Sequence, residues 1–143
     1  MNATSGTGDS TRVMHHVGIV LASIDAEVSS YETTLNLRVI NGPFIDPLQG
    51  ARVIFLSRGQ PGEAAIELVE PTSETSPVAS FLKRGGGMHH VCYVAKDLDR
   101  ELVRLRTQGA LLVRRALPAV AFQGRRIAWV YTRQRLLVEL LEE

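Results

Sequence analysis

The sequence predicts an α+β fold built from two tandem β-α-β-β-β modules, and two observations predict it. A twelve-residue phrase occurs twice, as MHHVGIVLASID at 14–25 and MHHVCYVAKDLD at 88–99, with six identical positions and an offset of 74 residues. About fifty residues after each copy comes an apolar strand with a central glutamate, Glu67 in IELVEP and Glu139 in VELLEE. Such a repeat within a short chain indicates a duplicated structural unit.

In the first module, residues 13–21 are mostly apolar and predict a buried strand. A helix is expected to begin near Asp25, which can cap it. Its apolar stripe has helical spacing and consists of Val28, Tyr31 and Leu35.

Three short strands complete the first module, at 38–41, 52–57 and 64–70. The segment between the first two, NGPFIDPLQG at 41–50, is rich in proline and glycine. It cannot lie in the interior of a sheet, so we expect a loop.

The second module repeats this order, with a strand at 88–95 and a helix that begins at Asp97 or Asp99 and ends at Gly109. The apolar stripe of this helix consists of Leu98, Leu102 and Leu105. Its remaining strands are expected at 111–116, 126–131 and 136–141.

We expect one domain over residues 13–143, with modules at 13–70 and 88–142 joined by a linker at 71–87. Each half is too small to bury a large core alone, so the two sheets should share one. A short helix in the linker is expected to be capped by Ser76, with Pro77 in its first turn. Residues 1–12 are small and polar and predict a disordered tail.

Composition excludes several classes of function. The net charge of +1 does not favour nucleic-acid binding, and no apolar run is long enough to span a membrane, which needs roughly 18 residues. The single cysteine, Cys92, cannot form an internal disulfide, which fits the reducing cytoplasm. We therefore expect a cytoplasmic protein that acts on a small molecule.

Both central glutamates are expected to be buried. Side chains alternate between the two faces of a strand, and the neighbours of Glu67 and Glu139 on both faces are apolar. A buried carboxylate is costly unless it is paired, neutralised or bound to a metal. Both residues are therefore candidate metal ligands.

Only one histidine of each pair can share a face with these glutamates if the strands alternate regularly. His16 shares its face with Gly18 and Val20, and His90 shares its face with Cys92 and Val94. These small neighbours leave room for a ligand, so His16 and His90 are assigned to the site.

The bulkier neighbours of the other two histidines indicate packing against the helices. This assignment places His15 with Val17 and Ile19, and His89 with Val91 and Tyr93.

Two imidazoles and two carboxylates form an N₂O₂ site suited to a divalent ion such as Mg, Mn, Fe, Co, Ni or Zn. On an octahedral ion two positions stay open for water or a bidentate oxygen substrate, which favours Lewis-acid chemistry. A single His-His pair is more often structural, but its repetition with a matching glutamate strand favours metal. The alternative is a duplicated fold that has lost its metal and serves as a binding pocket.

These residues resemble the vicinal oxygen chelate superfamily, which includes glyoxalase I, extradiol dioxygenases, bleomycin and fosfomycin resistance proteins, and methylmalonyl-CoA epimerase. The likeness covers about residues 13–141 and is strongest to the epimerase branch. The run IELVEPTSETSPVASFLKRGGGMHHVCYV is similar to that branch's strand, linker and second His strand. GRRIAWVY followed by LLVELLE is similar to its closing hairpin.

The resemblance implies a half-open, mostly antiparallel barrel around a divalent metal held by His16, Glu67, His90 and Glu139. It also implies proton transfer α to a carbonyl of an acyl-CoA or related substrate, with Glu139 and Glu67 as catalytic residues. A homodimer is implied as well, because members of this superfamily commonly build their barrels by pairing modules, either within one chain or between two chains. The second ligand is often Gln in this branch, where this chain has Glu67.

The chain departs from some epimerases that carry another Glu on the third strand, where it has Val53 in ARVIFLS. Asp46 or Glu63 on the flanking loops are candidate substitutes. Alternative functions are a metal-dependent lyase, hydrolase, cyclase or glyoxalase-like enzyme, or a non-catalytic binding or resistance protein. Dioxygenase chemistry is less favoured, because Fe(II) oxygenases usually use two His and one carboxylate.

The last set of candidates is basic, and these side chains either contact an acidic substrate tail such as a CoA phosphate or form a solvated strand edge. They are Arg114, Arg115, Arg125 and Arg126.

Overall fold

The computed structural model describes residues 13–143, so the tail expected at 1–12 lies outside the described residues. The first half contains β1 (Val13–Val20), α1 (Ile24–Leu35), β2 (Arg38–Asp46), β3 (Ala51–Ser57) and β4 (Ala65–Pro71). A short helix, α2 (Ala79–Lys83), leads to the second half. That half contains β5 (Gly87–Ala95), α3 (Leu98–Thr107), β6 (Leu111–Pro118), the 3₁₀ helix η1 (Val120–Phe122), β7 (Arg126–Tyr131) and β8 (Leu137–Glu142). The predicted order of elements is confirmed.

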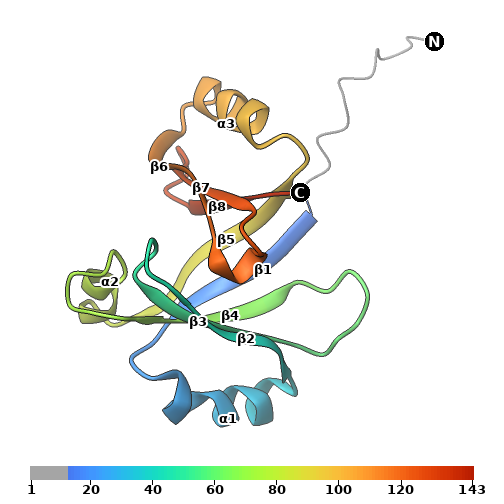
Figure 1. Cartoon of the computed structure of the whole chain (residues 1–143), viewed down its shortest axis with the longest axis vertical. Coiled ribbons are helices and arrows are strands. Elements are labelled where there is room, and N and C mark those ends of the chain that lie inside the picture. The colour runs from blue at the N-terminus through green and yellow to red at the C-terminus, as the bar shows by residue number, and fades with distance from the viewer. Residues whose placement is uncertain (1–12) are drawn as a thin grey trace.

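The strands form one eight-stranded mixed sheet in the order β2-β3-β4-β1-β5-β8-β7-β6. The first strand of each half is central, and β1 and β5 pair antiparallel. Within each half the first strand is parallel to the last, β1 to β4 and β5 to β8, and the other neighbours are antiparallel. The sheet curves without closing, and α1 and α3 lie at opposite ends of the molecule (Figure 1). The predicted fold class is therefore confirmed.

Alternation along the strands divides the core as predicted. The face of β8 that carries Glu139 also carries Leu141, which joins a central cluster with Val69 and Cys92. The opposite face carries Leu140, which packs with Leu98 of α3. Complete burial of one such leucine side chain stabilises the fold by roughly 1.5–3 kcal/mol.

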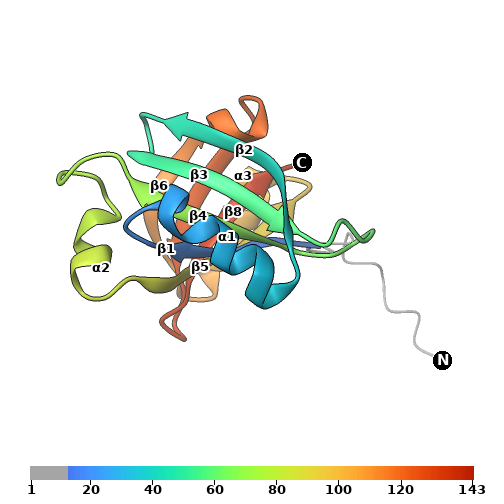
Figure 2. The same cartoon turned by 90° about the horizontal axis from the view of Figure 1, so that it is seen from below.

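Helix α1 covers the corresponding outer face of the first half. Ile24 of α1 packs with Leu56 of β3 and Leu68 of β4, and all three are almost fully buried. In Figure 2 α1 lies across the strands of its own half. Both helices thus occupy the outer face, which leaves the inner face of the sheet for the central cluster. Among residues 13–143 no helix has the length and apolar character required to cross a membrane.

The prediction of a loop at 41–50 is wrong for its first half, because β2 continues to Asp46. Strand β2 is at the edge of the sheet and pairs only with β3. An edge strand tolerates Pro43 because one side of its backbone forms no ladder. The register shifts between Val39 and Asn41 and between Asn41 and Phe44 accommodate the irregular sequence.

The helix caps were predicted in part. Asp97 caps α3 as expected, and its carboxylate accepts a hydrogen bond from the Arg100 backbone N–H at 3.0 Å. Helix α1 is capped by Ser23, so the expectation of a cap at Asp25 is wrong.

Ser76 does not cap α2, because that helix begins later, after Val78. The Ser76 hydroxyl instead donates to the Gly50 carbonyl at 2.6 Å, which ties the linker to the turn before β3.

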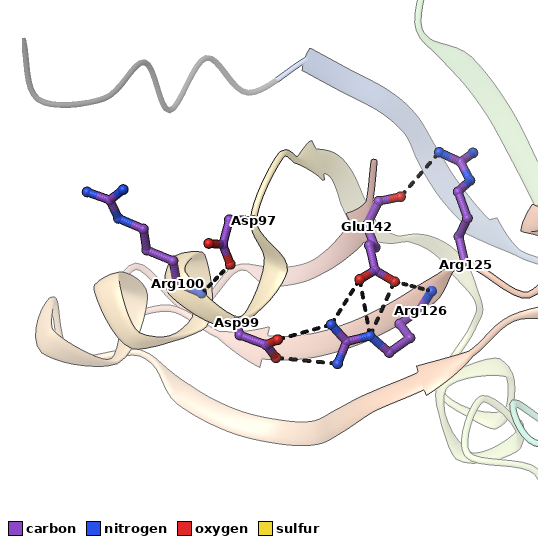
Figure 3. Close-up of polar contacts among 6 residues, drawn as sticks. All are labelled: Asp97, Asp99, Arg100, Arg125, Arg126 and Glu142. Atoms are coloured by element: carbon purple, nitrogen blue, oxygen red, sulfur yellow. Dashed lines mark hydrogen bonds and ion pairs between the residues drawn. The ribbon is translucent and has the colours of Figure 1, made fainter.

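An arginine on β7 joins the start of α3 to the end of β8. The Arg126 guanidinium lies 3.1 Å from Asp99 and 2.9 Å from Glu142, and the Glu142 carboxylate also accepts the Arg126 backbone N–H (Figure 3). Arg125 points to the other side of Glu142 and donates to its carbonyl. Arg126 is therefore occupied by structural ion pairs.

The first half contains the same arrangement. Arg52 on β3 lies 3.1 Å from Asp25 of α1 and 3.4 Å from Glu70 of β4. The aspartate that ends each copy of the repeated phrase therefore has the same structural role in both halves. It fastens the first turn of the helix to the sheet.

Candidate metal centre

The four side chains assigned to a metal site lie on the four central strands, β4, β1, β5 and β8. Pairing of β1 with β4 sets Gly18 opposite Glu67, and pairing of β1 with β5 sets Gly18 opposite His90. Cys92 lies opposite His16 on one side and Glu139 on the other. Each half contributes one histidine and one glutamate. The sheet register brings all four to the centre of the inner face.

Their donor atoms lie close together. The Nε2 atoms of His16 and His90 are 3.1 Å apart. Oε1 of Glu67 lies 3.6 Å from the His16 Nε2 and 3.4 Å from the His90 Nε2. Glu139 straddles the two rings, with Oε1 3.9 Å from the His16 Nε2 and Oε2 3.5 Å from the His90 Nε2.

The donor atoms of His16, Glu67 and His90 all lie within 4.8 Å of one another, as ligands of one divalent ion must, and Glu139 lies beside both rings. Donors about 2.1 Å from a common ion lie roughly 3.0–3.4 Å from their nearest neighbours in octahedral or tetrahedral geometry. Four of the five distances between these donors fall between 3.1 and 3.6 Å. In addition, Oε1 of Glu139 is buried and has no hydrogen-bond partner among the described residues. A cation would give this oxygen a partner, and the role of the four residues as ligands stays a prediction.

Burial governs the electrostatics of the four groups. It raises the pKa of Glu67 to about 8. It also raises the pKa of Glu139 to about 8, where the His90 ring acts in the opposite direction and Glu67 adds to the rise. Burial lowers the pKa of His16 and of His90. All four groups therefore favour their neutral forms in the absence of a cation, and a cation would favour the two carboxylates.

The prediction that His15 and His89 face away from the site toward the helices is wrong in its direction, although the His89 ring also contacts Phe81 of α2 at 4.7 Å. The β1–β5 pairing shifts register between Met14 and His16, which leaves His15 as an extra residue. It shifts again where Gly18 and Ile19 pair with His90 and Met88, which leaves His89 as an extra residue. A β-bulge interrupts the alternation of side chains. Both histidines consequently lie on the inner face beside the candidate ligands.

Each of these histidines contacts the ring of its neighbour. The Nδ1 atoms of His15 and His16 are 2.8 Å apart, and those of His89 and His90 are 2.9 Å apart. If Nε2 of His16 and His90 is free for a metal, Nδ1 carries the proton and donates to the adjacent histidine. This pairing orients both candidate ligand rings. Because regular alternation of side chains was assumed from the sequence, this contact between adjacent histidines was missed, although both histidine pairs are visible in the sequence.

Gly18 makes room for one of the candidate ligands. A Cβ atom added at this position would lie 2.0 Å from Cε1 of His90, inside van der Waals contact. The sequence argument expected Gly18 to leave space for a bound molecule. The structure shows that the space is filled by the His90 imidazole itself.

A cavity of about 460 Å³ opens beside the four groups. Its wall is mainly apolar and includes Val53, Phe122 and Trp129. Phe122 lies in η1, which was not predicted, and stacks on His16 at 6.1 Å with an interplanar angle of 14°. The Trp129 ring lies 4.7 Å from that of His90. The cavity can hold the reacting part of a substrate in a mostly apolar environment.

The two other carboxylates considered for catalysis are engaged elsewhere. Asp46 lines the cavity, but it accepts backbone N–H groups from Leu48 and Gln49 on one oxygen and from Val120 on the other. Glu63 is paired with Arg58 at 3.0 Å and lies outside this cavity. Val53 lines the cavity on β3, and the inner face of that strand carries no carboxylate.

Cys92 is fully buried beside Glu139. Burial and the neighbouring carboxylates raise the pKa of its thiol. A neutral thiol is a poor nucleophile and a poor metal ligand, and Cys92 packs in the central hydrophobic cluster without lining the cavity.

The four arginines have different surroundings. Arg126 is used in ion pairs, Arg115 is exposed, and Arg125 binds a backbone carbonyl. Arg114 alone of the four lines the cavity beside the candidate ligands.

The chain is similar in sequence to proteins of one superfamily. The profile of the Glyoxalase/Bleomycin resistance protein/Dioxygenase superfamily matches residues 15–129. The ethylmalonyl-CoA/methylmalonyl-CoA epimerase of Cereibacter sphaeroides is 31% identical over 131 residues, which cover 89% of this chain and 95% of that protein. An uncharacterised protein of Bacillus subtilis is 34% identical over 132 residues, with 90% of this chain and 91% of that protein covered.

The fold is also that of solved structures. The crystal structure of methylmalonyl-CoA epimerase from Mycobacterium tuberculosis superposes with a TM-score of 0.81 at 30% identity. The match covers 99% of this chain and 95% of that one. The likeness therefore extends over the whole of both modules.

Proposed function

The chain belongs to the glyoxalase/bleomycin resistance protein/dioxygenase superfamily, and from that premise we propose that it is a metal-dependent epimerase or isomerase that moves a proton α to a carbonyl. The observation that carries the proposal is the meeting of His16, Glu67, His90 and Glu139 beside an apolar cavity. The epimerase relatives support an acyl-CoA or related α-acidic thioester as substrate.

His16, Glu67, His90 and Glu139 would hold the divalent ion, with Co, Mn, Mg, Ni, Zn and Fe all suited to the donor set. A bound ion supplies Lewis-acid polarisation of the substrate carbonyl, which acidifies the α-carbon. His15 and His89 keep the two imidazoles in the orientation that this site requires.

The chain's own carboxylates provide the proton transfer in this proposal. In the metal-free protein burial raises the pKa of Glu139 and Glu67 to about 8, and a bound cation would favour their carboxylate forms, which can accept a proton. Glu139 would take the α-proton at one face, with Glu67 as the second candidate. The apolar wall excludes water and helps to retain the proton near the reacting carbon.

Exchange of the α-proton tests the function directly. The metal-supplemented protein is incubated with methylmalonyl-CoA in deuterated buffer, and the α-position is followed by NMR. Incorporation of deuterium well above the rate without protein is expected. Glu139→Gln should lower the rate by a factor of about 100 or more, the range of a general acid–base contribution.

An exposed carboxylate provides the control, because Glu74→Gln should leave the exchange rate unchanged. Lack of exchange with a panel of α-acidic thioesters and ketones, at full metal occupancy, would contradict the proposal.

A second candidate is supported by Val53. Epimerisation requires an acid and a base on opposite faces of the carbon, and β3 supplies no carboxylate to the cavity. A metal-dependent lyase, hydrolase, cyclase or glyoxalase-like step needs only one acid–base group. Turnover of a hemithioacetal without α-exchange of thioesters would favour this alternative.

A homodimer is part of the proposal. The two edge strands, β2 and β6, expose apolar side chains that include Ile40, Ile45, Leu111 and Val113. Exposed apolar edges invite pairing with another chain. Light scattering measures the oligomeric state, and a monomer at micromolar concentration would contradict it.

A further inference from the structure

One corner of the cavity is polar and lies apart from the four candidate ligands. It is formed by Gln49, which precedes β3 in the first half, and Arg114, which lies on β6 in the second. Nη1 of Arg114 donates to Oε1 of Gln49 at 3.4 Å. Nε1 of Trp129 donates to the same oxygen at 3.2 Å.

These two donors fix the orientation of the amide. With Oε1 engaged by Arg114 and Trp129, Nε2 is the free end of the Gln49 side chain. This nitrogen is buried and has no hydrogen-bond partner within residues 13–143. A flipped amide would place its NH₂ group against two other donors, so Gln49 offers a donor and not an acceptor.

Arg114 is half-buried and differs from the structural arginines. No carboxylate among the described residues lies within ion-pair distance of it, whereas Arg52 and Arg126 each contact two. Asp46 lines the same cavity, but its oxygens accept three backbone N–H groups. The corner therefore presents an unpaired positive charge and a lone amide donor, which together suit a group that only accepts hydrogen bonds.

The sheet register places this corner relative to the candidate metal centre. Arg114 pairs with Trp129 across β6 and β7, and Trp129 pairs with Glu139 across β7 and β8. Neighbouring strands are about 4.8 Å apart, so the backbone of Arg114 is roughly 10 Å from that of Glu139. The Trp129 indole lies between them. A molecule that reaches both ends would cross its ring.

We propose that Arg114 and Gln49 bind an anionic oxygen group, a carboxylate or a phosphate, at the end of the substrate remote from His16, Glu67, His90 and Glu139. The proposal rests on the proposed function in that both concern the same cavity. It adds that the substrate is anionic at a second point. Specificity then depends on the distance between the two ends.

Trp129 is the single tryptophan of the chain, so its fluorescence reports on this corner directly. Malonate, succinate, glutarate and adipate are titrated into Mn²⁺-loaded protein, each beside the monocarboxylate of equal chain length. A longer dicarboxylate is expected to bind about 10-fold or more tightly than its monocarboxylate partner, the range of a charge-assisted hydrogen bond. Arg114→Met should abolish this ratio, and Gln49→Leu should reduce it.

Arg115→Met is the matched control, because Arg115 is the exposed neighbour on the same strand and should leave the ratio unchanged. Succinate and 3-phosphonopropionate, which have the same chain length, distinguish a carboxylate from a phosphate-like group in the same titration. Equal ratios in Arg114→Met and the unmodified chain, or equal losses in Arg114→Met and Arg115→Met, would overturn the proposal. Arg114-dependent binding without α-proton exchange would overturn the proposed reaction and leave this subsite intact.

Discussion

At the scale of single residues, the proposed chemistry depends on two buried carboxyl groups that hold their protons in the metal-free protein. Glu67 and Glu139 are buried among apolar side chains, and burial raises the pKa of each to about 8. A ligand to a metal must be deprotonated. Metal binding by these residues would therefore be coupled to proton release.

We expect metal binding at pH 7 to release close to two protons, since both carboxyl groups are protonated in the metal-free protein. The affinity should rise with pH up to about 8, where the carboxyl groups ionise without metal. Calorimetric titration in buffers of different ionisation enthalpy measures the protons released. Metal binding to Glu139→Gln should release about one proton fewer. If metal binding to the unmodified chain releases no protons, the coupling is contradicted.

The same shifts determine the pH dependence of stability in the metal-free protein. The folded state keeps protons on Glu67 and Glu139 that the unfolded chain, with a pKa near 4.5, has lost. Raising the pH from about 6.5 to 8 should therefore lower the free energy of unfolding, by at least about 1 kcal/mol. Histidine titration opposes this trend near pH 6.5, because the unfolded chain binds protons at an imidazole pKa of 6.5 that the folded His16 and His90 do not bind. The carboxyl groups dominate toward pH 8, where unfolded imidazoles are already neutral. Urea unfolding at several pH values, with Glu67→Gln as control, measures the slope.

His15 and His89 were predicted to be packing residues, but they contact the candidate ligands. We predict that His89→Leu lowers metal affinity by about 10–100-fold, because Nδ1 of His90 loses its partner. His89→Asn should restore most of the affinity, since its amide oxygen can accept the same hydrogen bond. Calorimetry checks this, with the exposed Met88→Leu as the neighbouring control. Equal affinities of the Leu and Asn variants would contradict an orienting role.

At the scale of elements, the pairing of β1 with β5 decides the geometry of the site. This pair carries both histidine doublets and both bulges. The bulges turn two consecutive side chains toward the inner face on each strand, which regular alternation forbids. Gly18 then lies directly against the His90 ring. The site consequently depends on close approach of the two strands.

Gly18→Ala should displace His90, because the added methyl group would lie 2.0 Å from its Cε1 atom. We expect metal affinity to fall by at least about tenfold and the free energy of unfolding to fall by about 1–3 kcal/mol, as in overpacked cores. Titration of metal and urea unfolding measure the two effects. In a double-mutant cycle, His90→Ala should remove most of the stability cost of Gly18→Ala. Additive costs would show that the contact is not the cause.

At the scale of the whole molecule, duplication explains why the site is at the centre. Neither half contributes more than one histidine and one glutamate of the set, and the sheet joins the two halves through the β1–β5 pair. The repeated Arg–Asp–Glu arrangement, Arg52 with Asp25 and Arg126 with Asp99, fastens each helix to its own half. A cation would therefore link two units that are each internally braced.

Metal binding should stabilise both halves together. At a metal concentration 100 times the dissociation constant, we expect about 2.7 kcal/mol of added stability in a single unfolding transition. Trp129 fluorescence reports on the second half and far-ultraviolet circular dichroism on the whole chain, so coincident midpoints test the coupling. Glu139→Gln should lose most of the increase. If the fluorescence and circular dichroism transitions separate when metal is added, the coupling of the two halves is contradicted.

The repeat at 14–25 and 88–99 and the period-two pattern of the strands were sufficient to predict the fold class, the order of elements and the candidate site residues. Those properties depend on local sequence patterns, which can be identified without knowing which segments meet in the fold. The same pattern could not reveal the bulges, because an extra residue in one strand is defined only by its partner strand. It likewise missed η1 and its Phe122, the extension of β2 along an edge, and the meeting of Gln49 with Arg114 from opposite halves. Each of these depends on contacts between segments far apart in sequence, where packing overrides local preference.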